Sequence, residues 1–220
     1  MKMKIMIKNG STRILSAVIV LACLAGSAFA QIPPAETSVV AVARSFKDGG
    51  HYDKAAKGTG VIEELTFKGE KILGADPVGS YCCGFTLSVA LRTAGNRGLL
   101  KNKTPQDVRR FQKEWYGATP DTSEFTCTRA MTNFGIGRSI KFEEAQAGDF
   151  VQFWRSKTGH SVVFLNWVEK DGKKIGIHYR SSQTSTDGIG DRTEYFSDSG
   201  VKGGQITRNR TYFARLNDKP

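Results

Sequence analysis

Residues 147–183 read AGDFVQFWRSKTGHSVVFLNWVEKDGKKIGIHYRSSQ, and this stretch decides the predicted fold. It is rich in β-branched and aromatic residues that alternate with polar ones, the pattern of strands with one buried face. Asp171-Gly172 in its second half is typical of a two-residue hairpin turn. The stretch therefore predicts three antiparallel strands, over residues 149–155, 161–170 and 173–181.

The residues before this stretch carry helix signals. From Cys82 the apolar residues recur with the period of a helix, and Gly95 stands where a C-cap glycine belongs. Residues 104–107 (TPQD) supply the N-cap, the first-turn proline and the acidic residue of a second helix. A third helix is expected to begin at Thr122 or Ser123.

The order of these elements predicts the fold class α+β. Two further strands are expected over residues 193–196 and 211–216, so helices come first and antiparallel strands follow. N-terminal helices packed on an antiparallel β-sheet fit this order. Because no internal repeat and no linker rich in Pro, Gly or Ser divides the chain, we expect residues 31–220 to form one domain.

Residues 1–30 have the anatomy of a signal peptide. An apolar run over residues 14–24 follows a basic segment, and Ala28-Phe29-Ala30 has the small–x–small form of a cleavage site. Export to the periplasm or the extracellular space is therefore expected, with no transmembrane span in the mature protein. Residues 20–23 (VLAC) loosely resemble a lipoprotein box, which leaves open a lipid anchor at Cys23.

The formal charge is +11, and the first thirty residues contribute four positive and no negative charges, leaving +7 for the rest. Such a charge suits peripheral association with an anionic cell wall or membrane, and it fits a purely solubilising role equally well. The basic cluster over residues 101–113 lacks aromatic interleaving of the RNA-recognition type and any nucleic-acid motif. No nucleic-acid partner is therefore expected.

Three cysteines remain after the signal segment: Cys82, Cys83 and Cys127. In an oxidising compartment an odd thiol is left over, and such a thiol is a candidate for reactivity. Their spacing fits no zinc site, so we expect neither a metal nor an organic cofactor. Cys82 and Cys83 begin a predicted helix, whose free N–H groups favour thiolate over thiol. The alternative is that they are small buried residues or part of a structural disulfide.

A histidine at the entrance of a strand is the candidate base. His160 follows Gly159 and directly precedes the strand that starts at Ser161, so its side chain can face a cleft. Its ordinary pKa near neutrality lets imidazole take a proton from a thiol. His51 lies in a segment rich in Gly and Lys and is expected to be exposed and without a role.

The third member of the site follows from the hairpin. Counting back from the turn places Gln183 opposite His160, where its amide can accept from the imidazole and fix the tautomer. His178 is a second candidate, although it faces Leu165 in this register and points to the other side of the sheet. A site without any third member is also possible.

Together, Cys-x-Gly-Phe at residues 82–85, Gly-Asp at residues 148–149 and Gly-His-Ser at residues 159–161 resemble the NlpC-type and CHAP cell-wall hydrolases. The resemblance covers residues 76–185 and implies a papain-like cysteine peptidase or amidase that cuts peptidoglycan stem peptides. It implies Cys82 as nucleophile, His160 as base and Gln183 as the third polar residue. Tyr81 replaces the acidic residue that often precedes the nucleophile in this family.

The position of Cys83, where the family commonly has serine, suggests a hypothesis for the odd thiol. If Cys83 bonds Cys127, Cys82 stays free as the nucleophile, and exchanging Cys82 with Cys83 would reverse both roles. The expected function is an exported cysteine hydrolase that cleaves amide bonds in peptidoglycan. The alternative is a non-catalytic module on the same fold that binds cell-wall peptides or a partner protein.

Overall fold

The strands form a seven-stranded antiparallel sheet, in the order β1-β8-β7-β6-β5-β9-β4, and a separate hairpin of β2 and β3. The computed structural model describes residues 36–117 and 124–220. The strands in these residues are β1 Gly49–Gly50, β2 Leu65–Phe67, β3 Glu70–Leu73, β4 Gly137–Ile140, β5 Phe150–Arg155, β6 Thr158–Lys170, β7 Lys173–Gln183, β8 Gly188–Tyr195 and β9 Thr211–Leu216.

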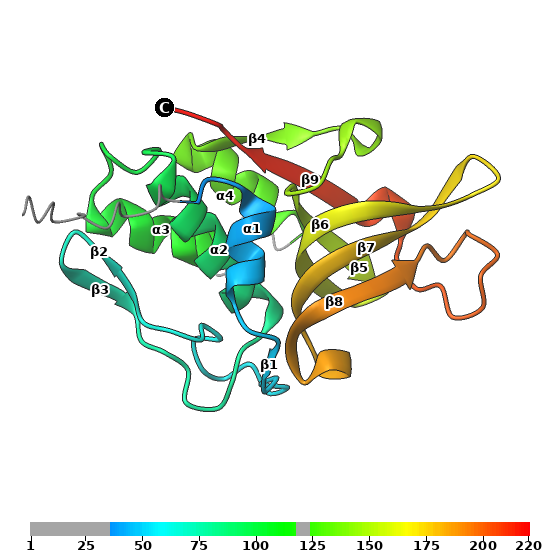
Figure 1. Ribbon diagram of the computed structural model, residues 1–220, viewed down its shortest axis with the longest axis horizontal. Coiled ribbons are helices and arrows are strands. Elements are labelled where there is room, and N and C mark those ends of the chain that lie inside the picture. The colour runs from blue at the N-terminus through cyan, green and yellow to red at the C-terminus, as the bar shows by residue number, and fades with distance from the viewer. Residues whose placement is uncertain (1–35, 118–123) are drawn as a thin grey trace, which may run out of the picture. The chain divides into compact units, whose positions relative to one another are not determined.

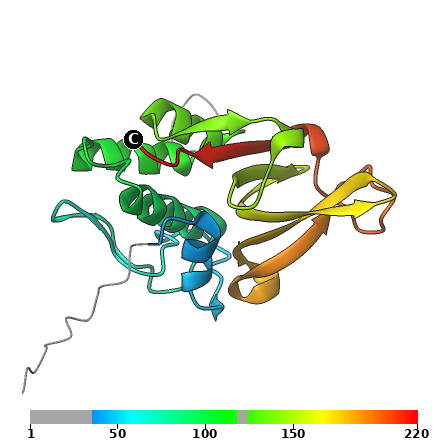
Figure 2. The ribbon, with the colours of Figure 1, turned by 45° about the horizontal axis from the view of Figure 1, so that its top comes forward.

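In the described part of the chain, four α-helices precede most of the sheet in the sequence. They are α1 Val39–Ser45, α2 Cys82–Asn96, α3 Pro105–Trp115 and α4 Thr126–Phe134, with short 3₁₀ turns at Phe142–Glu144, Thr184–Thr186 and Arg208–Arg210. Figures 1 and 2 both show these helices gathered on one side of the sheet, while the β6–β7 hairpin extends away from them. The α+β class and the packing of helices on an antiparallel sheet are thus confirmed.

The predicted helix signals act at the ends of α3 and α4. Thr104 caps α3, and its side chain and that of Asp107 form a reciprocal capping box, with Pro105 as the first helical residue. Gly135 ends α4 in the left-handed conformation, at φ 71°. The start of α4 at Thr126 is later than expected, and the predicted caps Thr122 and Ser123 lie outside the described residues.

The β6–β7 hairpin turns at Asp171-Gly172, where both residues have positive φ as a two-residue turn requires. Its ladder contains two register shifts, one between Phe164 and Asn166 and one between Val168 and Glu169. The extra residue lies on a different strand at each shift, so the two bulges cancel. Beyond them, Val163 pairs with Arg180 in the same register that counting from the turn gives.

Side chains of alternate residues on the central strands build two separate cores. The core between sheet and helices includes Phe150, Val163 and Ala214 together with residues of all four helices. The core on the opposite face includes Phe153, Phe164, Tyr179 and Phe213. Phe150 is fully buried, and its ring meets the edge of Trp115 from α3 at a centroid distance of 5.4 Å.

Three details differ from the sequence predictions. Gly95 lies inside α2, which continues to Asn96, and the left-handed glycine beyond its end is Gly98. His160 lies within β6 because that strand begins at Thr158, after a tight connection from β5. The edge strands β1 and β4 have no clear sequence signal, since both are short and one consists only of glycine. The signal segment, residues 1–30, lies outside the described residues.

We expect Phe150→Ala to lower the free energy of unfolding by about 3–5 kcal/mol, because it removes a fully buried ring between sheet and helices. Urea unfolding followed by far-UV circular dichroism measures this change. Val78→Ala is the matched control, since Val78 is 62% exposed and its truncation should change stability by no more than about 0.5 kcal/mol. A loss below about 1 kcal/mol for Phe150→Ala would contradict the packing described here.

Candidate active site

Cys82 is the first residue of α2, and the helix start around it has no side-chain cap. Tyr81 occupies the N-cap position but its side chain accepts no hydrogen bond from the first turn. The hydroxyl of Tyr81 instead donates to the carbonyl of Gly58, 3.0 Å away. The first N–H groups of the helix therefore keep their positive end free for a nearby negative charge, as at other helix N-termini.

Buried hydroxyl groups hold this helix start against the sheet. Thr86, one turn after Cys82, lies on α2 with its Oγ1 3.1 Å from Oγ of Ser161 on β6. The indole Nε1 of Trp115 donates to the same Thr86 oxygen at 3.1 Å. Just before the helix, the hydroxyl oxygens of Ser80 and Ser182 lie 2.8 Å apart. These contacts bring Cys82 beside the beginning of β6, where His160 precedes Ser161.

A pocket of about 170 Å³ opens at this junction of α2, β5 and β6. Both thiols and His160 line it, and the other walls are aromatic or neutral polar: Trp115, Tyr116, Thr126, Gln152, Trp154, Gly159 and Ser161. The indole of Trp154 is fixed by a hydrogen bond from Nε1 to the carbonyl of Glu124 at 2.7 Å. The structure thus brings Cys82, Cys83 and His160 to one pocket, which we call the thiol pocket.

The surroundings of the two neighbouring thiols differ. The Sγ atoms of Cys82 and Cys83 lie 3.9 Å apart. A hydrogen bond from Cys83 and the charge of His160 hold the pKa of the Cys82 thiol well below its usual range, although burial opposes this shift. The same contact, together with burial, raises the pKa of Cys83 well above its usual range. Because His160 and the Ser161 backbone amide act on Cys82, we assign the thiolate to Cys82 and the protonated thiol to Cys83.

All three cysteines of the described residues are free thiols. The hypothetical Cys83–Cys127 bond is thus not formed in this structure. Cys127 is fully buried in α4, and burial raises the pKa of its thiol to about 12. Cys127 therefore has the character of a small core residue. Cys83 instead has a polar neighbour, since the hydroxyl of Ser161 lies 3.8 Å from its Sγ.

His160 and Gln183 are both buried, at 4% and 3% exposure. The imidazole lies edge-on to the rings of Phe153 and Tyr179, at centroid distances of 5.5 and 5.7 Å. Its Nε2 has no hydrogen-bond partner among the described residues. The Gln183 amide nitrogen donates to Thr186 Oγ1 and to the carbonyl of Gly190, while its Oε1 has no partner among those residues.

Gln183 does not line the thiol pocket, and no hydrogen bond joins it to His160 in this structure. The β6–β7 ladder ends at the pair Val163–Arg180 and does not reach His160 and Gln183, so their opposition stays a prediction. The two atoms without partners are complementary, since an imidazole Nε2–H is a donor and an amide Oε1 is an acceptor.

The other two histidines lie outside the thiol pocket. His51 is exposed, as predicted, and its Nδ1 lies 3.0 Å from a carboxylate oxygen of Asp187. His178 pairs with Asn166 rather than with Leu165, because the bulge between Val168 and Glu169 shifts the ladder away from the register that counting from the turn gives. Its Nδ1 lies 3.1 Å from the Thr193 hydroxyl, so the structure does not bring it to Cys82.

Gly84, two residues after Cys82, lies where another part of the chain leaves no room for a side chain. A Cβ atom on Gly84 would lie 2.0 Å from the carbonyl oxygen of Gly60, so the backbone of residues 58–60 crosses directly over it. Tyr116 donates to the carbonyl of Thr59 at 2.6 Å and fixes this crossing. Gly84 therefore makes room for the chain itself and not for a substrate.

Several residues of the thiol pocket were missed in the sequence. Gln152 and Ser161 are polar residues at strand positions that face the helices, within otherwise apolar runs. A polar residue at an inward position is the signal that could have identified them. Thr86 supports this pocket without lining it, and it was missed because helical threonines commonly bond their own backbone, as Thr86 also does toward the carbonyl of Cys82.

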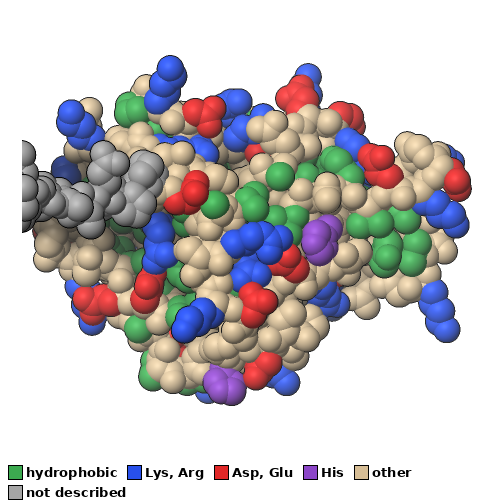
Figure 3. Space-filling model, in the orientation of Figure 1, with side chains coloured by type: hydrophobic (Ala, Val, Ile, Leu, Met, Phe, Trp, Pro, Cys, Tyr) green, Lys and Arg blue, Asp and Glu red, His purple; other side chains and the backbone are tan. Residues whose placement is uncertain are grey.

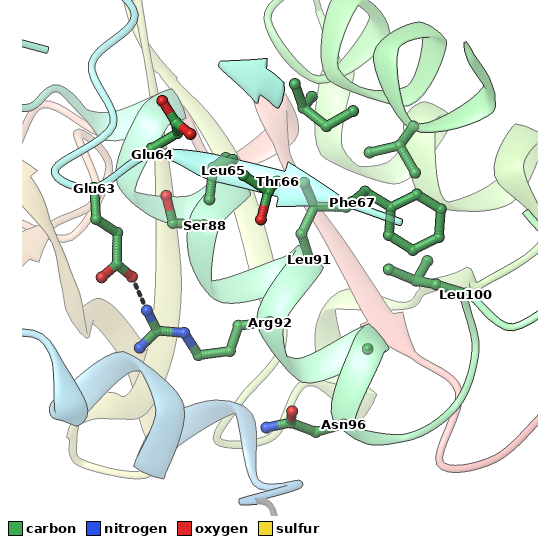
Figure 4. A pocket seen from close by; sticks show the side chains of 13 residues that line it. Glu63, Glu64, Leu65, Thr66, Phe67, Ser88, Leu91, Arg92, Asn96 and Leu100 are labelled. Carbon is green, nitrogen blue, oxygen red and sulfur yellow. Dashed lines mark ion pairs between the residues drawn. The ribbon is translucent and has the colours of Figure 1, made fainter. Parts of the chain in front are cut away.

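A second pocket, of about 310 Å³, lies between the β2–β3 hairpin and α2 (Figure 4). Glu63 and Arg92 form an ion pair in it, drawn as a dashed line, and Leu65, Phe67 and Leu91 supply apolar walls. No cysteine or histidine lines this pocket. It therefore offers neither a thiol nor an imidazole base, and the thiol pocket is the candidate active site.

Charges on the face shown in Figure 3 are interspersed, with blue and red side chains beside one another rather than gathered in a basic patch. The ion pairs Arg44–Asp191 and Arg109–Glu70, at 2.9 and 3.0 Å, are of this kind. In the described part of the chain, no group of three or more His, Cys, Asp or Glu is arranged to hold a metal ion. No helix among residues 36–117 and 124–220 is both long and apolar enough to cross a bilayer.

Comparison with known proteins finds no matching family model, no similar curated protein and no similar solved structure. The resemblance to the NlpC-type and CHAP hydrolases therefore stays a prediction from the residues quoted above.

We expect Cys82 to react with iodoacetamide near its plateau rate at neutral pH. The pKa of its thiol lies below the ordinary value of about 8.5, so the reactive thiolate is already the main form. His160→Ala and Cys83→Ala each remove a group that favours the thiolate, so both should move the midpoint of the pH–rate profile upward. Each unit of that shift lowers the rate at neutral pH by about tenfold.

Peptide mass spectrometry of the alkylated protein assigns the label to one cysteine and gives its rate. Cys127 in the same sample is the internal control, since its buried thiol, with a pKa of about 12, should label slowly throughout. A midpoint at the ordinary thiol value that His160→Ala does not change would contradict the assignment of Cys82.

Proposed function

We propose that this protein is an exported cysteine hydrolase with a papain-like arrangement, in which Cys82 attacks an amide bond and His160 acts as its base. One arrangement of groups supports this proposal most strongly. A thiol with a lowered pKa stands at an uncapped helix start and shares a small pocket with a buried histidine. The order of helix, thiol, strand and histidine matches the order in the family that residues 76–185 resemble.

The proposed reaction uses groups already in place around the pocket. The Cys82 thiolate forms a bond to the carbonyl carbon, and the π electron pair of the carbonyl moves onto its oxygen. The tetrahedral adduct then collapses, the leaving amine takes a proton from His160, and a thioester remains on Cys82. Water attacks the thioester while His160 takes its proton, and the acid product leaves as the Cys82 thiolate is restored.

Gln183 is proposed as the positioning residue for His160. During turnover the imidazole carries a proton on each nitrogen, and the buried Nε2–H then needs an acceptor. The Oε1 of Gln183 lacks a partner, and two hydrogen bonds hold its amide nitrogen in place. A small closure of the strand ends during turnover would join the two groups, since catalytic hydrogen bonds often tighten only in the substrate complex.

The proposed substrate is a peptide of peptidoglycan, which follows from the family resemblance and from export. Among the described residues, no Asp, Glu, Lys or Arg lines the thiol pocket. Its volume of about 170 Å³ suits a small, uncharged residue on the acyl side of the cleaved bond. The net positive charge would favour weak association with an anionic wall or membrane surface.

We expect the wild-type protein to release soluble fragments from purified peptidoglycan, and Cys82→Ala to release none. His160→Ala should lower the rate by about 10²–10⁴-fold, the range of general acid–base catalysis. Gln183→Ala should lower it less, and Gln183→Glu should restore part of the loss because it keeps an acceptor at the same position. Mass spectrometry of the fragments identifies the cleaved bond.

His178→Ala is the matched control for His160→Ala, because His178 lies outside the thiol pocket and should keep the wild-type rate. Equal digestion by wild type and Cys82→Ala would contradict the proposed function. Binding to peptidoglycan without digestion, by wild type and Cys82→Ala alike, would support the non-catalytic module instead.

A further inference from the structure

Gln152 is the one glutamine in the wall of the thiol pocket, and the reaction above gives it no role. It lies on β5 opposite Ser161 of β6 and is 5% exposed. A carboxamide at such a position is costly to bury unless its donors and acceptor are satisfied. The hydrogen bonds of the Gln152 side chain therefore indicate its role in the pocket.

One end of this amide is fixed by the protein. Oε1 of Gln152 accepts a hydrogen bond from the hydroxyl of Thr126, the first residue of α4, at 3.3 Å. This contact turns the NH₂ group toward β6, where a Cβ atom on Gly159 would lie only 2.7 Å from Nε2. Glycine at residue 159 thus leaves room for the amide nitrogen directly beside His160.

The other end has no protein acceptor. Nε2 of Gln152 forms no hydrogen bond with any residue of the described ranges, although the side chain is more than nine-tenths buried. The first two residues of α2, Cys82 and Cys83, line the same pocket, and their helix start has no side-chain cap. Two independent sources of N–H donors, a buried carboxamide and a helix N-terminus, therefore meet where Cys82 would form its adduct.

We propose that Gln152 donates a hydrogen bond to the oxyanion that forms when Cys82 attacks the substrate carbonyl. This inference rests on the proposed hydrolase function. When the sulfur–carbon bond forms, the π electron pair becomes a full negative charge on oxygen, and the Nε2–H of Gln152 stabilises it together with the α2 amides. Thr126 is a positioning residue in this arrangement, because its hydroxyl fixes which end of the amide points into the pocket.

The role predicts a separation between two reactions of the same thiol. Alkylation by iodoacetamide transfers a carbon to sulfur without creating an oxyanion, so it reports thiolate reactivity alone. Acetylation by p-nitrophenyl acetate passes through a tetrahedral oxyanion and needs the donors. Gln152→Ala should therefore lower the acetylation rate of Cys82 by about 10²–10³-fold, the effect of losing one oxyanion donor. The alkylation rate should stay within about twofold of wild type, as for loss of an interaction made only in the transition state.

A second variant keeps the test valid if Gln152→Ala disturbs the fold. Gln152→Glu keeps the size and the acceptor for Thr126 but replaces the NH₂ donor with a carboxylate oxygen, so acetylation should fall at least as far. Gln146→Ala is the matched control, since Gln146 is exposed and lies outside the thiol pocket. Burst kinetics of p-nitrophenolate release give the acetylation rate, with Cys82→Ala as the baseline.

Each outcome decides a different point. Loss of acetylation with preserved alkylation supports the oxyanion role of Gln152. Wild-type acetylation in both Gln152 variants would overturn that role and leave the hydrolase proposal intact. An equal fall of the acetylation and alkylation rates would also overturn the oxyanion role, and it would indicate that Gln152 activates the thiol instead. If wild-type protein shows no burst beyond Cys82→Ala, the proposed function fails and this inference fails with it.

Discussion

The hydrogen bond between the hydroxyls of Thr86 and Ser161 is the contact on which the candidate site depends. Thr86 lies one turn after Cys82 on α2, and Ser161 directly follows His160 on β6. Joining the two hydroxyls therefore fixes the start of the helix against the start of the strand. Trp115 donates to the same Thr86 oxygen, so α3 is tied into the junction as well. Losing one of these buried partners would leave the other unsatisfied, at a cost of about 1–3 kcal/mol.

This junction also explains why two adjacent thiols differ in character. Cys82 and Cys83 share the helix N-terminus, so the helix alone does not distinguish them. The difference arises from the strand, because His160 and the Ser161 amide act on Cys82. Cys83 meets the Ser161 hydroxyl and serves as a donor to its neighbour. The contact between the two thiols lowers the pKa of Cys82 and raises the pKa of Cys83, so one thiol ionises while the other keeps its proton and donates to it.

The sequence predicts the elements whose signals are local. The capping box at Thr104 and the Asp171-Gly172 turn give α3 and the β6–β7 hairpin because each requires only a few neighbouring residues. Cys82 and His160 could be chosen because a thiol at a helix start and a histidine at a strand entrance are themselves local patterns, and the structure brings both to one pocket.

Features that depend on contacts distant in sequence were not predicted. The two bulges of the hairpin restore the simple register only because they cancel. Gly176, a glycine inside a strand pattern, is a signal for the bulge beside it, but no pattern indicates the bulge between Phe164 and Asn166. The crossing of Gly60 over Gly84 changes the meaning of a glycine that fits the family motif. Gln152 is a single polar residue in an apolar strand, and its orientation depends on Thr126, twenty-six residues earlier in the chain.

The assignment of Cys82 as nucleophile is tested most directly by finding where the acyl group is attached to the protein during turnover. Wild-type protein is mixed with peptidoglycan fragments, quenched in acid and mapped by peptide mass spectrometry. We expect a thioester on Cys82 that is absent from Cys82→Ala and longer-lived in His160→Ala once formed, because that variant activates water poorly. An acyl group on Cys83, or fragment release by wild type and Cys82→Ala alike, would contradict this assignment.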